Sequence, residues 1–396
     1  MGQDGTATES MTGSRVNEFE NHIVAQDMEP EDVYKIIKDI MASQAQIIIH
    51  GEDGEDIFFE IPKRGRKYMD HSHSSTIPLL RAGNNSIRSF IHDRTTHDYC
   101  MTIWVMMVIT EIIANRVTIT ELELYHMNEV LFDNKQTVDR ILNDICCMIR
   151  CKRRSLNVVS AQRGSVVGDI SMRMNNGRVV ECSEVALIPN DTRKISEIMV
   201  NKNATEIKFI LIVQTEFMFQ HLQKMKFHTL QHCIIVTACG VPDFSTLEFI
   251  QLLKLTINLP IYALTDPDPL GIKTLTVYAR GSIKTAQENF NLAIPDIQWL
   301  GISTLDYEDF GLVLNCQNSV ALSQTEIKRL SDLLTDEYLQ LPDVWKKRIR
   351  HIVDSKRKMC YEDLHFYGCE FAAKTFLPWL IDRLREPRRP SCVINI

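Results

Sequence analysis

Three short apolar runs stand out in the second half of the chain. They cover residues 209–213, 233–236 and 261–264, and the segments between them are long enough to form helices. A strand that is buried on both faces is apolar at every position, so these runs predict the strands of a parallel α/β sheet. Ligand sites of such sheets lie at the carboxyl ends of the strands. The residues directly after each run are therefore candidate site residues.

Helical periodicity marks the first half of the chain. Residues 16–42 place Val33, Ile36, Ile37 and Ile40 along one face, which predicts an N-terminal helix. Residues 102–113 form an apolar run that is too short to cross a bilayer, which takes ~20 residues. We therefore expect a buried helix there and no contact with a membrane.

Two further helices are predicted between residues 120 and 148. Thr120 and Glu123 have the spacing of a capping box, so a helix that carries Tyr125 and His126 should begin here. After a break at 133–134, apolar residues return at helical spacing, namely Val138, Ile141, Leu142, Ile145 and Met148. Two helices joined by a short turn indicate a helix-turn-helix.

A basic segment follows the second of these helices. Lys152, Arg153 and Arg154 precede an alternating segment at 155–160, and Arg163 precedes a glycine and the apolar pair 166–167. Two helices followed by a basic hairpin are the arrangement of a winged helix, which places a helix in a DNA groove and a hairpin beside it. We therefore expect these four basic side chains to contact DNA. A small α/β domain with a charged face explains the pattern equally well.

Polar side chains follow two of the three predicted strands. Gln214 and Glu216 come after the first run, and Asp266 and Asp268 come after the third. Mg²⁺ is usually held by one or two carboxylates and keeps several waters, so these residues are candidate Mg²⁺ ligands. Loops after strands are also rich in aspartate for reasons of turn geometry, and this alternative stays open.

Length and charge limit the possibilities further. A chain of 396 residues is long for one hydrophobic core, and we expect an N-terminal helix and flexible linker (1–91), a winged-helix domain (92–200) and a sheet domain with a C-terminal extension (201–396). The linker should include a mobile connector at 62–86. The net charge of −7 restricts any DNA-binding surface to a local basic stripe. Eleven cysteines without a CxxC pair indicate a reducing compartment.

In their order along the chain, these segments resemble the eukaryotic relatives of the DNA topoisomerase VI A subunit, the transesterases that make meiotic double-strand breaks. Tyr125-His126 with Leu131-Phe132 resembles the helix that carries the nucleophilic tyrosine of that family. Arg153-Arg154-Ser155-Leu156 resembles the segment that follows it. The motifs at 240–243 and 266–271 resemble Toprim signatures, and those at 299–301 and 354–356 extend the similarity, which covers roughly residues 102–358.

The resemblance implies a CAP-like winged-helix domain followed by a Toprim metal-binding domain. It also implies a nuclear protein that uses Mg²⁺ and acts on double-stranded DNA, either as a homodimer or with a topoisomerase VI B-like subunit. Tyr125 and His126 become the candidate catalytic residues, because His126 stands where the family has its nucleophilic tyrosine. Gln214 stands where the family has a metal-binding glutamate, and Leu122 stands where a basic residue is expected.

Two hypotheses of different classes follow from these departures. One is a DNA-cleaving transesterase that initiates meiotic recombination with a divergent site. The other is a catalytically impaired paralogue that binds DNA or dimerises. A weaker third is a Toprim protein with unrelated nucleic-acid chemistry. Function depends on the site and not on the fold, so the fold alone does not decide between them.

Overall fold

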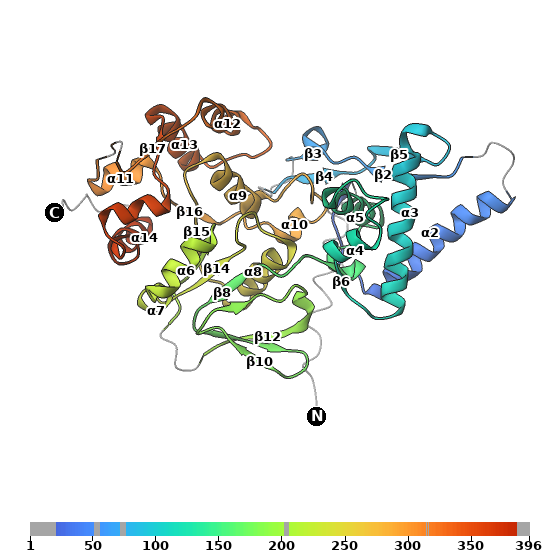
Figure 1. Ribbon diagram of the computed structural model, residues 1–396, viewed down its shortest axis with the longest axis horizontal. Helices are drawn as coiled ribbons and strands as arrows, with labels where there is room; N and C mark the ends of the chain where they lie inside the picture. Colours follow the sequence, from blue (N-terminus) through green and yellow to red (C-terminus); the bar gives the residue numbers. More distant parts are fainter. Residues whose placement is uncertain are drawn as a thin grey trace. The chain divides into compact units, whose positions relative to one another are not determined.

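A computed structural model describes residues 21–50, 56–71, 77–201, 206–313, 315 and 317–385. The chain divides into two compact units (Figure 1). Unit 1 comprises Met1–Ala161 and Gly281–Asn291, and unit 2 comprises Gln162–Arg280 and Leu292–Ile396. These bounds differ from the expected divisions at 91 and 200. Side chains from residues 21–91 help to form the core of unit 1, and strands from residues 162–200 belong to unit 2.

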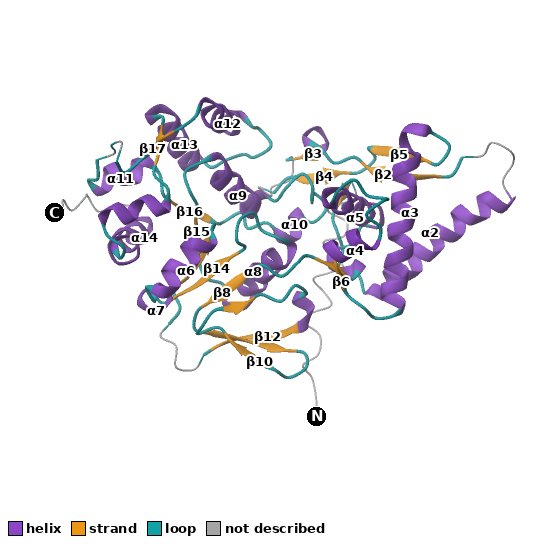
Figure 2. Ribbon diagram, in the orientation of Figure 1, coloured by secondary structure: helices purple, strands orange, loops and turns teal. Residues whose placement is uncertain are grey.

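Unit 1 is mainly helical, with short strands around the helices (Figure 2). Helices α2, α3 and α5 supply most of its core, in which Val33, Ile37, Val105, Ile109 and Ile141 are fully buried. In chain order its elements are β1 (His22–Ile23), α2 (Pro30–His50), β2 (Phe58–Pro62), η2 (Arg66–Tyr68), β3 (Met69–Asp70), β4 (Leu79–Arg81), β5 (Asn85–Ser89), α3 (Asp93–Ala114), β6 (Ile119–Thr120), α4 (Glu121–Met127), α5 (Lys135–Ile149), η3 (Arg153–Leu156) and β7 (Val158–Val159). Helix α10 (Asn289–Leu292) follows much later in the chain.

The helices of unit 1 confirm most of the expectations for this part of the chain. Thr120 and Glu123 form both hydrogen bonds of the capping box at α4, and Asn134 caps α5. Helix α3 is the expected buried helix. It is long and apolar enough to cross a membrane by length and composition, but a core helix passes the same test, and its apolar side chains help to form the core of unit 1.

Two expectations for the strands of unit 1 are wrong. The segment 62–86 is no mobile connector in its described part, because β2 pairs with β5 in an antiparallel ladder and β4 lies between β1 and β3. The strands of the expected basic hairpin do not pair with each other either. Strand β7 pairs with β6, whereas β8 (Ser165–Val167) pairs with β14 and β11 of unit 2. Local alternation cannot reveal which distant strand completes a ladder.

Unit 2 contains a six-stranded mixed sheet with the order β11-β8-β14-β13-β15-β16. Its early elements are β9 (Ile170–Met174), β10 (Val179–Glu181), β11 (Ala186–Leu187), η4 (Thr192–Lys194) and β12 (Ile195–Val200). The central elements are β13 (Phe209–Val213), α6 (Glu216–Lys224), α7 (Phe227–Gln231), β14 (Cys233–Thr237), α8 (Phe244–Ile257), β15 (Ile261–Leu264), α9 (Pro269–Arg280) and β16 (Gln298–Gly301). The last are α11 (Thr304–Phe310), β17 (Val320–Ala321), α12 (Gln324–Thr335), α13 (Asp343–Ser355), β18 (Arg357–Lys358), η5 (Tyr361–Tyr367), η6 (Ala372–Phe376) and α14 (Leu377–Arg385).

The path of the chain through this sheet reverses its direction at one point. Strands β13, β14 and β15 are parallel, as the apolar runs predict, and β16 pairs with β15 in the same direction. From β13 the chain moves outward to β14, and it then crosses back to β15 on the other side of β13. Right-handed crossovers in opposite directions place the connecting helices on opposite faces of the sheet. The carboxyl ends of β13 and β15 therefore flank a topological switch point, the usual ligand site of such sheets.

Candidate functional site

The two predicted strand ends meet at the switch point of unit 2. Gln214 directly follows β13, and Asp266 lies two residues beyond β15. The backbone amide of Asp266 donates a hydrogen bond to Oε1 of Gln214 at 2.8 Å. Both residues are buried. The structure therefore brings together two of the residues that the sequence predicted at the strand ends.

The backbone of Gly271 closes the floor of this strand-end site. A Cβ atom at Gly271 would lie 2.2 Å from the carbonyl oxygen of Asp266 and 2.8 Å from Oε1 of Gln214. The amide of Gly271 also donates to Oδ1 of Asp268 at 2.8 Å, which caps the start of α9. Any residue other than glycine would displace these two oxygens, because its Cβ would overlap them.

A lysine contacts the outer carboxylate of the site. Nζ of Lys358 lies 3.4 Å from Oδ2 of Asp268 and 2.8 Å from Oε1 of Glu326. The hydrogen bond from Lys358, together with those from Ser323, lowers the pKa of Glu326 to about 2. Lys358 therefore joins β18 and α12 to Asp268 and supplies a positive charge next to it.

Asp266 is the carboxylate with the most perturbed environment in the site. Burial raises its pKa to about 7, and the nearby carboxylates of Glu362 and Asp268 add to the increase. The amide of Tyr361, which donates to Oδ1 at 3.0 Å, and the charge of Lys358 oppose it. An additional positive charge at this position would stabilise the ionised form of Asp266.

These residues fit a divalent cation with an incomplete set of protein ligands. Asp266 and Asp268 provide carboxylates at the switch point, and Gln214 provides a neutral carbonyl oxygen. Glu216 begins α6, where its Oε1 accepts a hydrogen bond from Gln220 at 2.8 Å. Within the described ranges, no three His, Cys, Asp or Glu side chains are grouped closely enough to hold a metal ion. A hard cation that keeps several waters suits such a site better than one that needs a full set of protein ligands.

The two candidate nucleophiles lie on α4 of unit 1 and differ in exposure. The ring of Tyr125 is half-buried against the hydrophobic core, and it lies edge-on to the ring of His126 with 5.3 Å between the centroids. The side chain of His126 is 56% exposed. In this conformation His126 is therefore the more accessible of the two.

A carboxylate orients the imidazole of His126. Its Nδ1 lies 2.5 Å from Oε1 of Glu129. An ionised carboxylate has no proton to donate, so Nδ1 is the donor of this hydrogen bond. When the ring is neutral, Nε2 is then the nitrogen with the free lone pair. This tautomer can act as a nucleophile or as a general base through Nε2.

Arg153, one of the four predicted DNA contacts, is buried. Its side chain is 2% exposed and forms ion pairs with Glu121 at 3.0 Å and Asp139 at 3.4 Å. Its backbone amide donates to Oε1 of Glu288 at 2.8 Å. Burial alone would lower the pKa of Arg153, but the two carboxylates outweigh this effect and raise it. A buried guanidinium with these partners has a structural role and cannot reach a phosphate.

The other three predicted DNA contacts are more accessible. Lys152 and Arg154 both pair with Asp27, with side chains that are 19% and 22% exposed. Arg163, in unit 2, is 51% exposed and lies 3.9 Å from Asp243. Each therefore has an acidic partner in the same unit, from which it would have to separate to bind a phosphate.

Sequence reasoning missed three residues of the strand-end site. Lys358 and Tyr361 lie about ninety residues after Asp266, and no local spacing connects them to it. Gly271 was visible only as part of a motif. A positive charge was to be expected near the paired aspartates, but the sequence did not indicate which of many lysines and arginines supplies it.

Comparison with known proteins assigns both units to one kind of protein. The Toprim-domain family model that describes the topoisomerase 6 A subunit and Spo11 matches residues 209–381, and the model described as type IIB DNA topoisomerase matches residues 97–158. Meiotic recombination protein SPO11-4 of Oryza sativa subsp. japonica is 31% identical over 94% of this chain and 75% of its own length. The DNA topoisomerase 6 A subunit of Arabidopsis thaliana is 27% identical over 82% and 75%. Meiotic recombination protein SPO11 of Homo sapiens is 26% identical over 87% and 85%.

Proposed function

Because this chain belongs to the family of Spo11 proteins and topoisomerase VI A subunits, we propose that it is a nuclear DNA-cleaving transesterase that makes the double-strand breaks of meiotic recombination. The observation that carries the proposal is the extent of the similarity to SPO11-4, 94% of the chain. Its substrate is double-stranded DNA, and two copies, or one copy with a topoisomerase VI B-like subunit, act together. Helices α4 and α5 serve as the helices of a winged-helix DNA-binding domain, with Lys152, Arg154 and Arg163 as phosphate contacts.

His126 is the nucleophile that the geometry favours. Its exposed Nε2 attacks a backbone phosphorus, the bond from phosphorus to the 3′ oxygen breaks, and that oxygen takes a proton from water. Glu129 accepts the hydrogen bond from Nδ1–H of His126 and stabilises the positive charge that develops on the ring. The product is a 5′ phosphate bound to the protein and a free 3′ hydroxyl. Attack by the hydroxyl of Tyr125 would require its half-buried ring to move.

Asp266 and Asp268, with the side chain of Gln214 in contact with Asp266, are the residues that would hold Mg²⁺, and Glu216 at the start of α6 is a further candidate. The cation supplies neutralisation of negative charge on the phosphate when it is bound. The protein contributes by positioning: Tyr361 and Gly271 donate backbone hydrogen bonds that orient the two aspartates.

A catalytically impaired paralogue is the second candidate, and specific contacts favour it. Oε1 of Gln214 already accepts a hydrogen bond from Asp266, and the ammonium of Lys358 lies beside Asp268. Leu122, where the family has a basic residue, is 42% exposed and offers no charge to a phosphate. The first two features weaken the binding of a cation, and the third removes a charge that would stabilise the transition state of the transesterase reaction.

Trapping of protein–DNA adducts separates the two candidates. The chain is incubated with supercoiled DNA, Mg²⁺ and its partner proteins, denatured, and assayed for DNA that remains covalently bound. The transesterase proposal expects an adduct that is lost in His126→Ala and Asp266→Ala and kept in Tyr125→Phe. Acid lability of the link would indicate a phosphohistidine, whereas an acid-stable link lost in Tyr125→Phe would indicate attack by tyrosine. DNA binding without any adduct would support the impaired paralogue.

A further inference from the structure

A cavity of unit 1 that is lined by many charged side chains includes no residue of α4, the helix of Tyr125 and His126. Its volume is about 490 Å³, within the range of ~300–1,000 Å³ that is typical of small-molecule pockets. Its walls come from residues 61–68, from β5, from one face of α5 and from residues 283–284. Five basic side chains line it, namely Lys63, Arg64, Arg88, Arg140 and Lys284. Two of these belong to the basic segment 63–67, for which the proposed cleavage reaction has no use.

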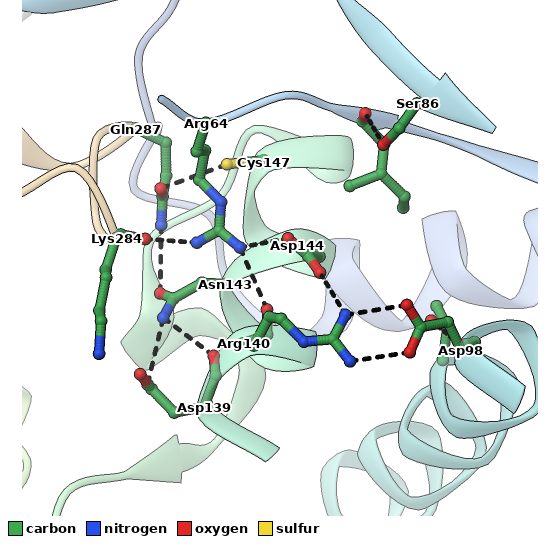
Figure 3. A network of polar contacts seen from close by, with 12 residues as sticks. Arg64, Ser86, Asp98, Asp139, Arg140, Asn143, Asp144, Cys147, Lys284 and Gln287 are labelled. Carbon is green, nitrogen blue, oxygen red and sulfur yellow. Dashed lines mark hydrogen bonds and ion pairs between the residues drawn. The ribbon is translucent and has the colours of Figure 1, made fainter. Parts of the chain in front are cut away.

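Part of the lining belongs to a partly buried network of guanidinium groups and carboxylates (Figure 3). Arg64 and Arg88 both donate to the carboxylate of Asp144, and Arg140 lies 3.9 Å from it. Asp98 pairs with Arg140 at 2.8 Å and with Arg88 at 3.8 Å. Three guanidinium groups therefore share two carboxylates. The lining of the cavity carries five basic side chains against two carboxylates, those of Asp139 and Asp144, and a hollow with this dominant sign of charge attracts an anion.

Two more cations line the cavity. Lys63 and Lys284 are both exposed, and neither ammonium group forms a hydrogen bond or ion pair with the part of the chain that the structure describes. In Figure 3 the side chain of Lys284 extends away from the network. Asp139, the remaining acidic residue of the wall, already pairs with Arg153 and accepts a hydrogen bond from Asn143. Because Arg153 also pairs with Glu121, four arginines face four carboxylates in this network, and the excess positive charge of the cavity comes from the two lysines.

We propose that this cavity binds a phosphate group, with Lys63 and Lys284 as its direct contacts and the arginine network behind them. Lysine binds phosphate as a point charge, and guanidinium groups that are held in place keep the surrounding potential positive. The phosphate belongs either to a small phosphorylated molecule or to the backbone of bound DNA. The second source rests on the proposed function.

The test compares two double variants that remove equal charge. Lys63→Ala/Lys284→Ala removes the proposed contacts and leaves Arg64 and Asp144 intact. Lys35→Ala/Lys38→Ala, on exposed positions of α2 in the same unit, is the control. Binding of inorganic pyrophosphate to the full chain is measured by titration calorimetry. Binding of a short DNA duplex is measured across a series of salt concentrations.

A small-molecule source predicts that wild type and control bind pyrophosphate and that Lys63→Ala/Lys284→Ala binds it at least about tenfold more weakly. A DNA source predicts that all three proteins behave alike toward pyrophosphate. For DNA binding, the log–log salt slope of Lys63→Ala/Lys284→Ala should then be shallower than that of wild type and control by roughly 1.8, because each lost phosphate contact removes about 0.9. Equal behaviour of the two double variants in both assays would overturn the inference. A chain that binds no DNA at all would refute the proposed function. The pyrophosphate titration would still show whether the cavity binds a phosphate group.

Discussion

Replacement of Arg153 by alanine should destabilise unit 1 far more than replacement of its neighbour Arg154. The guanidinium of Arg153 is 2% exposed and lies 3.0 Å from Glu121, whose side chain is 12% exposed. At that distance Coulomb's law gives roughly 5–6 kcal/mol with an effective dielectric constant of ~20. Loss of one partner of a buried pair costs about 3–5 kcal/mol, because the other charges stay buried.

The Asp139 carboxylate, 32% exposed, regains some hydration in Arg153→Ala, so we expect the lower end of that range. Arg154→Ala breaks an ion pair with Asp27, which is half exposed, and should cost about 0–1 kcal/mol. Hydrogen exchange at the amides of α5 reports the stability of unit 1 without interference from unit 2. Equal protection in the two variants would refute this assignment of Arg153 to the core.

Three further predictions concern single residues. Thr120→Ala should lower the free energy of unfolding by ~1 kcal/mol through loss of the capping box, as urea titration would show. Gly271→Ala should abolish binding of divalent cations measured by calorimetry, because its Cβ would collide with the backbone of Asp266, and a variant that binds normally would contradict this. Glu326→Gln should be less stable than wild type above pH ~4.5, and the difference should vanish as the pH falls from about 4.5 to about 2. In the folded state Lys358 lowers the pKa of Glu326, so the ionised carboxylate stabilises the fold, and this stabilisation is lost when Glu326 is protonated.

Much of the fold could be predicted from local patterns. Continuous apolar runs predicted β13, β14 and β15, and a hydroxyl and a glutamate three residues apart predicted the start of α4. These signals are local: a strand buried on both faces needs apolar side chains throughout, and a helix needs its first amides capped. The partners of β7 and β8 could not be predicted, because strand pairing depends on segments far apart in the chain.

The candidate site could be predicted in part for the same reason. Asp266 and Gln214 closely follow strands that pair with each other, so their contact follows from the sheet. The burial of Arg153 could not be seen, because its partners Glu121 and Asp139 lie in other segments and a run of basic residues usually faces solvent. The sequence shows which residues can carry a charge, but not which of them are paired or buried inside the fold.

The measurement that tests the proposed function most directly is the recovery of this chain from meiotic cells under fully denaturing conditions, followed by labelling of free 3′ ends on any attached DNA. The transesterase account predicts that DNA stays covalently attached through its 5′ end, and that the label disappears when His126→Ala replaces the wild-type chain. If the wild-type chain carries no attached DNA in cells that make meiotic breaks, the account is contradicted, and the protein is the impaired, DNA-binding or dimerising member of its family.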